Sequence, residues 1–287
     1  MRSRAMNSDL CKDETKTDFM PAVSMQNVLI PTDFSGNARN AIAYAAQLLD
    51  ERHFTFVLLH TYPGVSTSPQ DSAQYATKKL KEEVAILQKD YPERHFRVRT
   101  EAGDLHTVAA ELVRQENFSI VVMGTRGLQK GKSAFWGTHT SKVAENTSCP
   151  TIIVPEKASY QPPQQIIFAT DFELNPGKSL DFLLDVAERF ASRITVLHVL
   201  PEDKQIGAEE LNGLQLLHER GNRIASHFIR SKNVAEGITD FVRAHRTDML
   251  AVMKHSYGFM EQLFHKSITK ELALHADVPI LVLHDRK

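Results

Sequence analysis

The residues with the clearest chemical potential lie in a glycine-rich stretch near the middle of the chain. Met123-Gly-Thr-Arg-Gly127 is followed, after nine residues, by Gly137-Thr-His-Thr140. An apolar run at 119–122 precedes this stretch and a helical pattern starts at Thr138, so the chain passes from a buried strand through a loop into a helix. Glycine lets the backbone approach a ligand closely, and a helix N-terminus presents free N–H groups. The pattern therefore predicts a phosphate site.

The strands and helices around this loop must position it. Apolar runs and helical patterns alternate along the first half of the chain, from residue 27 to residue 154. Such an alternation predicts an α/β fold in which helices cover an open parallel sheet. In sheets of this kind, ligands bind outside the carboxyl ends of the strands, where the strand order reverses.

Several strand ends supply groups to that edge of the sheet. Pro31, Thr32 and Asp33 follow the first strand, Thr61 follows the second, and Met123 ends the fourth. The Asp33 carboxylate suits hydrogen bonds from ribose hydroxyls or from the edge of a base.

Side chains at the start of the helix that begins at Thr138 are suited to contact phosphates. The hydroxyls of Thr138 and Thr140 are suited to donate to phosphate oxygens, and Arg126 adds positive charge.

The same pattern recurs in the second half of the chain. Val28–Phe34 returns as Ile166–Phe172 at an offset of 138 residues, and this offset falls to about 130 farther on. Self-similarity of this length indicates a duplicated domain. The change in offset predicts that the second helix of the second copy is shorter by about two turns. We expect a disordered tail at 1–24, a first domain at 25–155, a linker at 156–164 and a second domain at 165–287.

Composition narrows the classes of function. The chain of 287 residues carries 34 basic and 35 acidic residues, so it lacks the basic excess of proteins that bind nucleic acids or anionic membranes. Two cysteines argue against a disulfide framework, and no apolar run reaches the length of a membrane span. We therefore expect a cytoplasmic protein.

The glycine spacing resembles the nucleotide-binding signature of the universal stress protein family. Gly124-x-x-Gly127, nine residues and then Gly137-Thr138 carry the resemblance, and the segments 28–35, 58–60 and 149–155 also fit. It covers nearly all of residues 25–287 as two tandem copies. The resemblance implies that each copy is a five-stranded parallel sheet of order 3-2-1-4-5 with helices on both faces.

The same resemblance implies that the first domain binds ATP or a related adenine nucleotide, with or without Mg²⁺. It places Asp33 and the Thr61 backbone at the nucleoside, and the glycines with Thr138 and Thr140 at the phosphates. Arg126 stands where the residue varies within the family. The expected nucleotide-binding residues are Pro31, Thr32, Asp33, Thr61, Met123, Gly124, Arg126, Gly127, Gly137, Thr138, His139 and Thr140.

The second copy departs from this signature. Lys254 and Lys266 stand where the first and third glycines are expected, and the spacing is one residue short. Side chains at these points of close approach are expected to block a nucleotide, so the second domain is predicted to be a structural or regulatory partner. We also expect the strands at 151–154 and 280–283 to pair within the chain, which would make a pseudo-dimer and cover two exposed edges. Homodimerisation of the whole chain remains open.

Some of these residues have a structural interpretation as well. Asp33 is also typical of an aspartate that caps a turn. His60 and His198 are more typical of histidines that satisfy a backbone group at a strand end than of catalytic groups. No histidine spacing indicates a zinc site, and Cys149 fits a small buried apolar residue.

Three functions remain open from the sequence. The first is a stress-response module that binds a nucleotide without turning it over. The second is a slow ATPase or nucleotide hydrolase, which would need a second acidic residue beside Asp33 to hold Mg²⁺, and the sequence does not reveal one. The third is a dimerisation scaffold that binds no nucleotide.

Overall fold

The computed structural model describes residues 25–49, 53–63, 69–125, 138–172, 178–203, 205–221, 223–254 and 278–284. The expected tail at 1–24 lies outside these residues. In the first domain, strands and helices alternate as β1 (Gln26–Pro31), α1 (Gly36–Leu48), β2 (Phe54–Tyr62), α2 (Pro69–Asp90), β3 (His95–Ala102), α3 (Leu105–Gln115), β4 (Phe118–Gly124), α4 (Thr138–Asn146) and β5 (Thr151–Val154).

The second domain repeats the alternation. Its elements are β6 (Gln165–Ala169), α5 (Lys178–Arg189), β7 (Arg193–Leu200), α6 (Ala208–Arg220), β8 (Ile224–Arg230), α7 (Val234–Ala244), β9 (Met249–Lys254) and β10 (Ile280–His284). Helix α2 has 22 residues and its counterpart α6 has 13, which agrees with the expected loss of about two turns.

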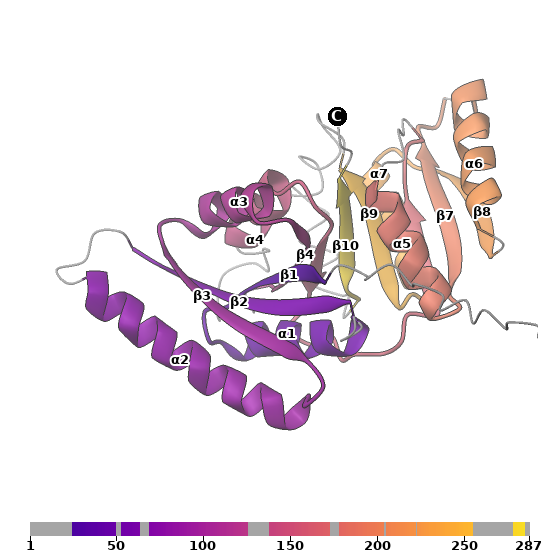
Figure 1. Ribbon diagram of the computed structural model, residues 1–287. Helices are drawn as coiled ribbons and strands as arrows, with labels where there is room; N and C mark the ends of the chain where they lie inside the picture. The colour runs from indigo at the N-terminus through magenta and orange to yellow at the C-terminus, as the bar shows by residue number, and fades with distance from the viewer. Residues whose placement is uncertain are drawn as a thin grey trace, which may run out of the picture.

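All described strands belong to one ten-stranded sheet of order β3-β2-β1-β4-β5-β10-β9-β6-β7-β8 (Figure 1). Each half has the order 3-2-1-4-5 and its pairs are parallel, which confirms the predicted fold class. The central strands are apolar on both sides, as β1 shows, because Val28, Leu29 and Ile30 are fully buried.

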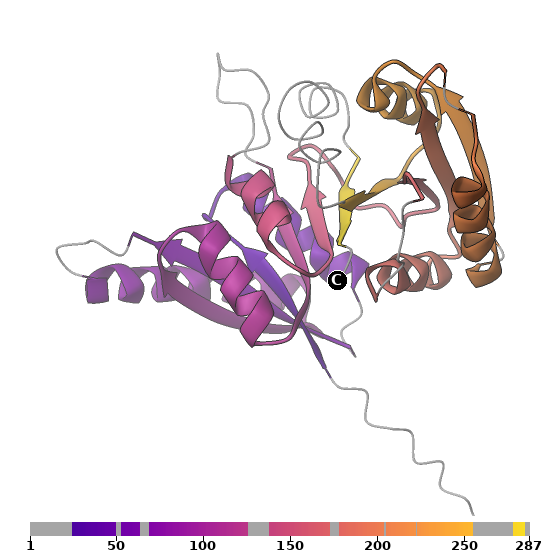
Figure 2. The same ribbon diagram turned by 90° about the horizontal axis from the view of Figure 1, so that it is seen from above.

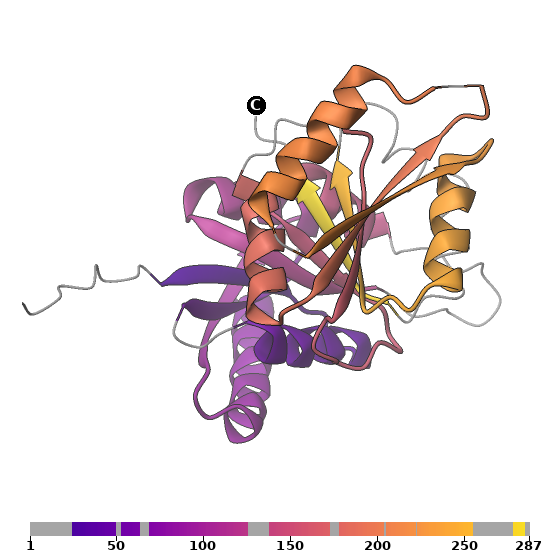
Figure 3. The same cartoon turned by 90° about the vertical axis from the view of Figure 1, so that its right-hand side faces the viewer.

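Helices cover both faces of the sheet. In the first domain α1 and α2 lie on one side and α3 and α4 on the other (Figures 1 and 2). Alternate residues of β1 follow this division, because Val28 and Ile30 pack in the cluster that contains α1, whereas Leu29 packs in the cluster that contains α3. In the second domain α5 and α6 face α7 across the sheet (Figure 3).

Strands β5 and β10 join the two domains. They pair antiparallel, with Ile152 opposite Leu281 and Ile153 opposite Ile280, and these four residues are buried. The apolar cluster on the α1 face contains residues of both domains. The backbone edge of β5 is therefore covered within the chain.

The linker also packs on the first domain. The Asn40 side chain donates to the carbonyl oxygens of Pro155 (3.2 Å) and Ala158 (2.8 Å). The rings of Tyr44, from α1, and Tyr160, from the linker, meet edge to face with centroids 5.3 Å apart. These contacts hold the linker against α1. Within the described residues, no helix combines the length and apolarity that crossing a bilayer requires.

The hydroxyl of Tyr44 is an unfavourable buried polar group where the linker packs on α1. Tyr44 is 2% exposed, and its hydroxyl has no hydrogen-bond partner among the described residues. Burial raises the pKa of Tyr44 well above its ordinary value, and Tyr160 and Asp248 add to the effect. The phenol is therefore neutral at physiological pH, and it has lost hydration without a compensating hydrogen bond.

Replacing this phenol with Tyr44→Phe is expected to stabilise the protein by about 1 kcal/mol, because the ring is kept and an unsatisfied polar group is removed. Urea unfolding of the two proteins measures the difference. Tyr75→Phe, at a residue that is 63% exposed, is the matched control and should change little. A clear loss of stability in Tyr44→Phe would show that the hydroxyl has a partner.

Candidate functional site

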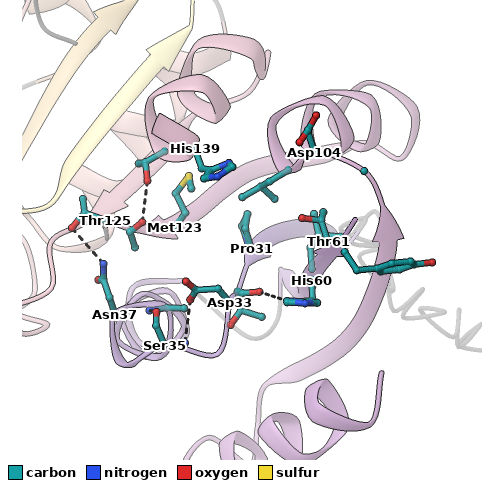
Figure 4. Close-up of a pocket in the computed structure, with 18 of the residues that line it drawn as sticks. Pro31, Asp33, Ser35, Asn37, His60, Thr61, Asp104, Met123, Thr125 and His139 are labelled. Carbon is teal, nitrogen blue, oxygen red and sulfur yellow. Dashed lines mark hydrogen bonds between the residues drawn. The ribbon is translucent and has the colours of Figure 1, made fainter. Parts of the chain in front are cut away.

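A cavity of about 640 Å³ lies at the carboxyl ends of β1, β2 and β4 in the first domain (Figure 4). Its walls come from these strand ends and from the residues at the starts of α1, α3 and α4. This is the edge of the sheet at which the sequence predicts a ligand, because β1 and β4 are the neighbouring strands where the strand order reverses.

Most of the expected nucleotide-binding residues line this one cavity. They are Pro31, Thr32, Asp33, Thr61, Met123, Gly124, His139 and Thr140. Arg126, Gly127 and Gly137 lie outside the described residues, as does the side chain of Thr138, although the backbone of Thr138 begins α4. The part of the expected phosphate cradle that lies within the loop therefore stays a prediction.

The turn after β1 is built by short side chains that bond to its own backbone. The Thr32 hydroxyl accepts from the N–H of Phe34 at 3.1 Å, and the Asp33 carboxylate accepts from the N–H of Ser35 at 3.1 Å. Phe34 has a φ of 65°, which is uncommon for an aromatic residue. Ser35 then caps α1 by accepting from the N–H of Ala38 at 3.2 Å. Asp33 thus serves the turn and is also exposed at the cavity.

His60 holds the same turn from β2. Its Nδ1 lies 2.8 Å from the carbonyl oxygen of Thr32, and its ring lies against Phe34 with centroids 4.7 Å apart. The interpretation of His60 as a residue that satisfies a backbone group is confirmed.

The second domain repeats the contacts of the histidine and the phenylalanine. His198 Nδ1 lies 2.7 Å from the Thr170 carbonyl oxygen, and Phe172 has a φ of 62° and packs on the His198 ring. The arrangement therefore occurs both in the domain with the complete glycine signature and in the domain without it. We infer that the histidine and the strained turn belong to the fold and not to a reaction.

Gly124 has a packing role that the sequence analysis did not reveal. A Cβ at this position would lie 2.7 Å from the backbone oxygen of Asn37 and 2.8 Å from its side-chain oxygen. The end of β4 and the first turn of α1 therefore touch without room for a methyl group. Glycine is required here for contact within the protein, whatever ligand the cavity holds.

Thr140 makes a contact within the protein. Its hydroxyl donates to the carbonyl oxygen of Gly124 at 3.3 Å, and the residue is 2% exposed. This bond fastens the start of α4 to the end of β4, and the expected contact of Thr140 with a phosphate stays a prediction. His139, one residue earlier, is exposed and turned toward the cavity (Figure 4).

Sequence reasoning missed several lining residues, of which Asp104 matters most. It stands at the N-cap position of α3, but its side chain makes no capping hydrogen bond and it lines the cavity. Asp104 is thus a second carboxylate at this cavity besides Asp33. The signal was available, because Asp104 follows β3, whose carboxyl end lies beside that of β2. Within the part of the chain that the structure describes, no three acidic, histidine or cysteine residues are grouped to bind a metal.

The corresponding corner of the second domain lies at the carboxyl end of β9. Lys254 ends β9, but its side chain and residues 255–277, which include Lys266, lie outside the described residues. The expectation that lysines block this corner remains untested. What the structure does describe there is an aromatic cluster, in which Phe228 of β8 packs on both Phe172 and His198.

The comparison with protein families agrees with the fold described above. The model of the universal stress protein family matches the chain twice, over residues 25–155 and 163–284. No curated protein matches the sequence significantly.

Two solved structures are similar over nearly the whole chain. A universal stress protein from Archaeoglobus fulgidus DSM 4304 has a TM-score of 0.69 at 15% identity, and the match covers 90% of this chain and 96% of that one. A functionally unknown protein from Pseudomonas aeruginosa PAO1 has a TM-score of 0.59 at 15% identity, covering 92% and 94%. At these identities the similarity shows a shared fold.

The contact at Gly124 predicts that alanine changes the stability of the protein differently at two glycine positions. Gly124→Ala should destabilise the protein by about 1–3 kcal/mol, because a methyl group would collide with the backbone of Asn37. Gly36→Ala, in the first turn of α1, is the control, because a Cβ there meets nothing within 4 Å. Urea unfolding of both variants tests the contrast, and equal stabilities would contradict the assigned contact.

Proposed function

This chain belongs to the universal stress protein family, and on that premise we propose that it is a stress-response protein whose first domain binds ATP or a related adenine nucleotide. The proposal rests on one observation, the cavity at the carboxyl ends of β1, β2 and β4. Its volume of about 640 Å³ lies within the range of small-molecule sites in proteins.

The lining of the cavity supports a ligand with an apolar base and a polar tail. Pro31, Leu59, Leu105 and Met123 provide apolar walls. Polar groups lie toward both ends, with Thr61 and Asp104 at one end and Asn37 and Thr125 at the other (Figure 4). A nucleotide fits this pattern, because its base is flat and largely apolar while its ribose and phosphates require hydrogen-bond partners.

We place the phosphates near the start of α4. The first turn of a helix has N–H groups without intrahelical partners, and the helix dipole favours an anion there. His139 is exposed on this turn and lines the cavity. The nucleoside then extends toward Thr61 and Asp33. Gly127 and Gly137 keep their expected place in the phosphate cradle as part of this proposal.

The second domain is proposed to be a structural or regulatory partner. The pairing of β5 with β10 and the apolar cluster shared by both domains support an intramolecular pseudo-dimer. In this arrangement the second domain protects the β5 edge, which would otherwise be open to other chains.

Slow nucleotide hydrolysis is a second candidate function. Asp104 supplies a second carboxylate in the cavity, but it lies at the end away from the proposed phosphates and does not by itself favour turnover. Hydrolysis also requires a positioned water and metal-held phosphates. We prefer binding without turnover, and rapid release of phosphate in a single-turnover assay with ATP would reverse this preference.

Placing a negative charge at the start of α4 tests the proposed site. His139→Glu should weaken ATP binding about tenfold or more, because a carboxylate would face the phosphates. The fold should tolerate the change, since His139 is exposed and an acidic residue is favourable in the first turn of a helix. Isothermal titration calorimetry on the full chain measures both affinities.

Lys142→Gln is the matched control, because it changes the net charge by the same amount on an exposed residue of α4 that does not line the cavity. It should leave the ATP affinity within about twofold. Failure of the unaltered protein to bind ATP would reject the proposed function, and equal binding by His139→Glu would reject the placement of the phosphates.

A further inference from the structure

The fold alone gives no reason for a carboxylate at position 104. Asp104 occupies the N-cap position of α3 with extended backbone angles (φ −77°, ψ 132°), where an aspartate ordinarily accepts a hydrogen bond from the first turn. Here the side chain makes no such bond. It is exposed at the cavity instead, at the same end as Thr61 (Figure 4).

The backbone fixes Asp104 at this end. The preceding residue, Gly103, has a φ of 126° and its N–H donates to the carbonyl oxygen of Tyr62 at 2.8 Å. This bond ties the turn between β3 and α3 to the end of β2. Position 103 favours glycine because side chains rarely adopt such a φ. The carboxylate of Asp104 therefore stands on a defined turn beside the end of β2.

The neighbouring walls suit a flat base. Leu105 follows Asp104 and lines the cavity together with Pro31 and Met123, and all three are apolar. A base held among these residues would present its polar edge to the end of the cavity at which Asp104 lies. An ionised carboxylate is an acceptor only, so it requires a donor from the ligand.

We propose that Asp104 is a specificity-determining residue that accepts a hydrogen bond from the exocyclic 6-amino group of the base. This inference rests on the proposed nucleotide function and adds the residue that reads the base. The carboxylate also disfavours phosphates at its own end of the cavity. It therefore helps to orient the ligand with its phosphates toward α4.

A ligand analogue tests the hydrogen bond directly. Purine riboside triphosphate is ATP without the 6-amino group, so the unaltered protein should bind it at least about tenfold more weakly than ATP. In Asp104→Ala, ATP should weaken to about the level of the analogue, whereas the affinity for the analogue should change little. Calorimetric titration of the full chain with both ligands gives the four affinities, and their ratio isolates the contact.

Two controls separate this role from a structural one. Asp203→Ala removes the same charge from an exposed turn of the second domain and should retain the tenfold preference for ATP. Asp104→Ala should lower the thermal unfolding midpoint by no more than about 2–3 °C, because no capping bond is lost and only the interaction of the carboxylate with the helix dipole is removed. Asp104→Ser, which can restore a cap, should fail to restore the preference.

The outcomes distinguish the two proposals. If the unaltered protein binds ATP and the analogue equally, or if Asp104→Ala retains the preference, the role of Asp104 is rejected while nucleotide binding stands. Tighter binding of GTP than of ATP, with the preference lost in Asp104→Ala, would also reject the 6-amino contact. If neither ligand binds, the proposed function is rejected together with this inference.

Discussion

The contact between the end of β4 and the first turn of α1 governs the geometry of the candidate site. Gly124 lies against Asn37 with no space for a Cβ, and the Gly124 carbonyl oxygen receives the hydroxyl of Thr140. One glycine thus joins β4 to α1 and fastens α4 beside them. The cavity is bounded on this side by backbone, which cannot retreat by changing a rotamer, so the position of the helix start is set before any ligand arrives.

Both domains keep the turn after their first strand, and only the first keeps the complete glycine loop. The turn that contains Thr32 and Phe34 and its supporting His60 recur as Thr170, Phe172 and His198, with nearly the same distances and the same positive φ at the phenylalanine. A strained backbone persists only where its surroundings determine it. The histidine and the turn are therefore requirements of the sheet and its first helix, whereas the glycine loop is an addition found complete only in the first domain.

Much of the fold was predictable because hydrophobic periodicity and the internal repeat constrain it. The expected strand at 151–154 has the bounds found in the structure, and the strand order agrees in both domains. The site was harder to predict, because a residue type does not show which partner takes its hydrogen bond. Thr140 was expected at a phosphate, and its hydroxyl donates to the carbonyl oxygen of Gly124. Asp104 lines the cavity because the carboxyl ends of β3 and β2 lie side by side. In both cases the neighbour belongs to another element of the fold.

The antiparallel pairing of β5 with β10 has a consequence for communication between the domains. Each half of the sheet is parallel within itself, so reversing the direction at this one pair turns the second half around. The carboxyl ends of the two sets of strands consequently open on opposite edges of the continuous sheet. A molecule bound in the first domain therefore lies at the other edge of the sheet from the corresponding corner of the second. The packed interior that the domains share and the linker on α1 connect the two corners.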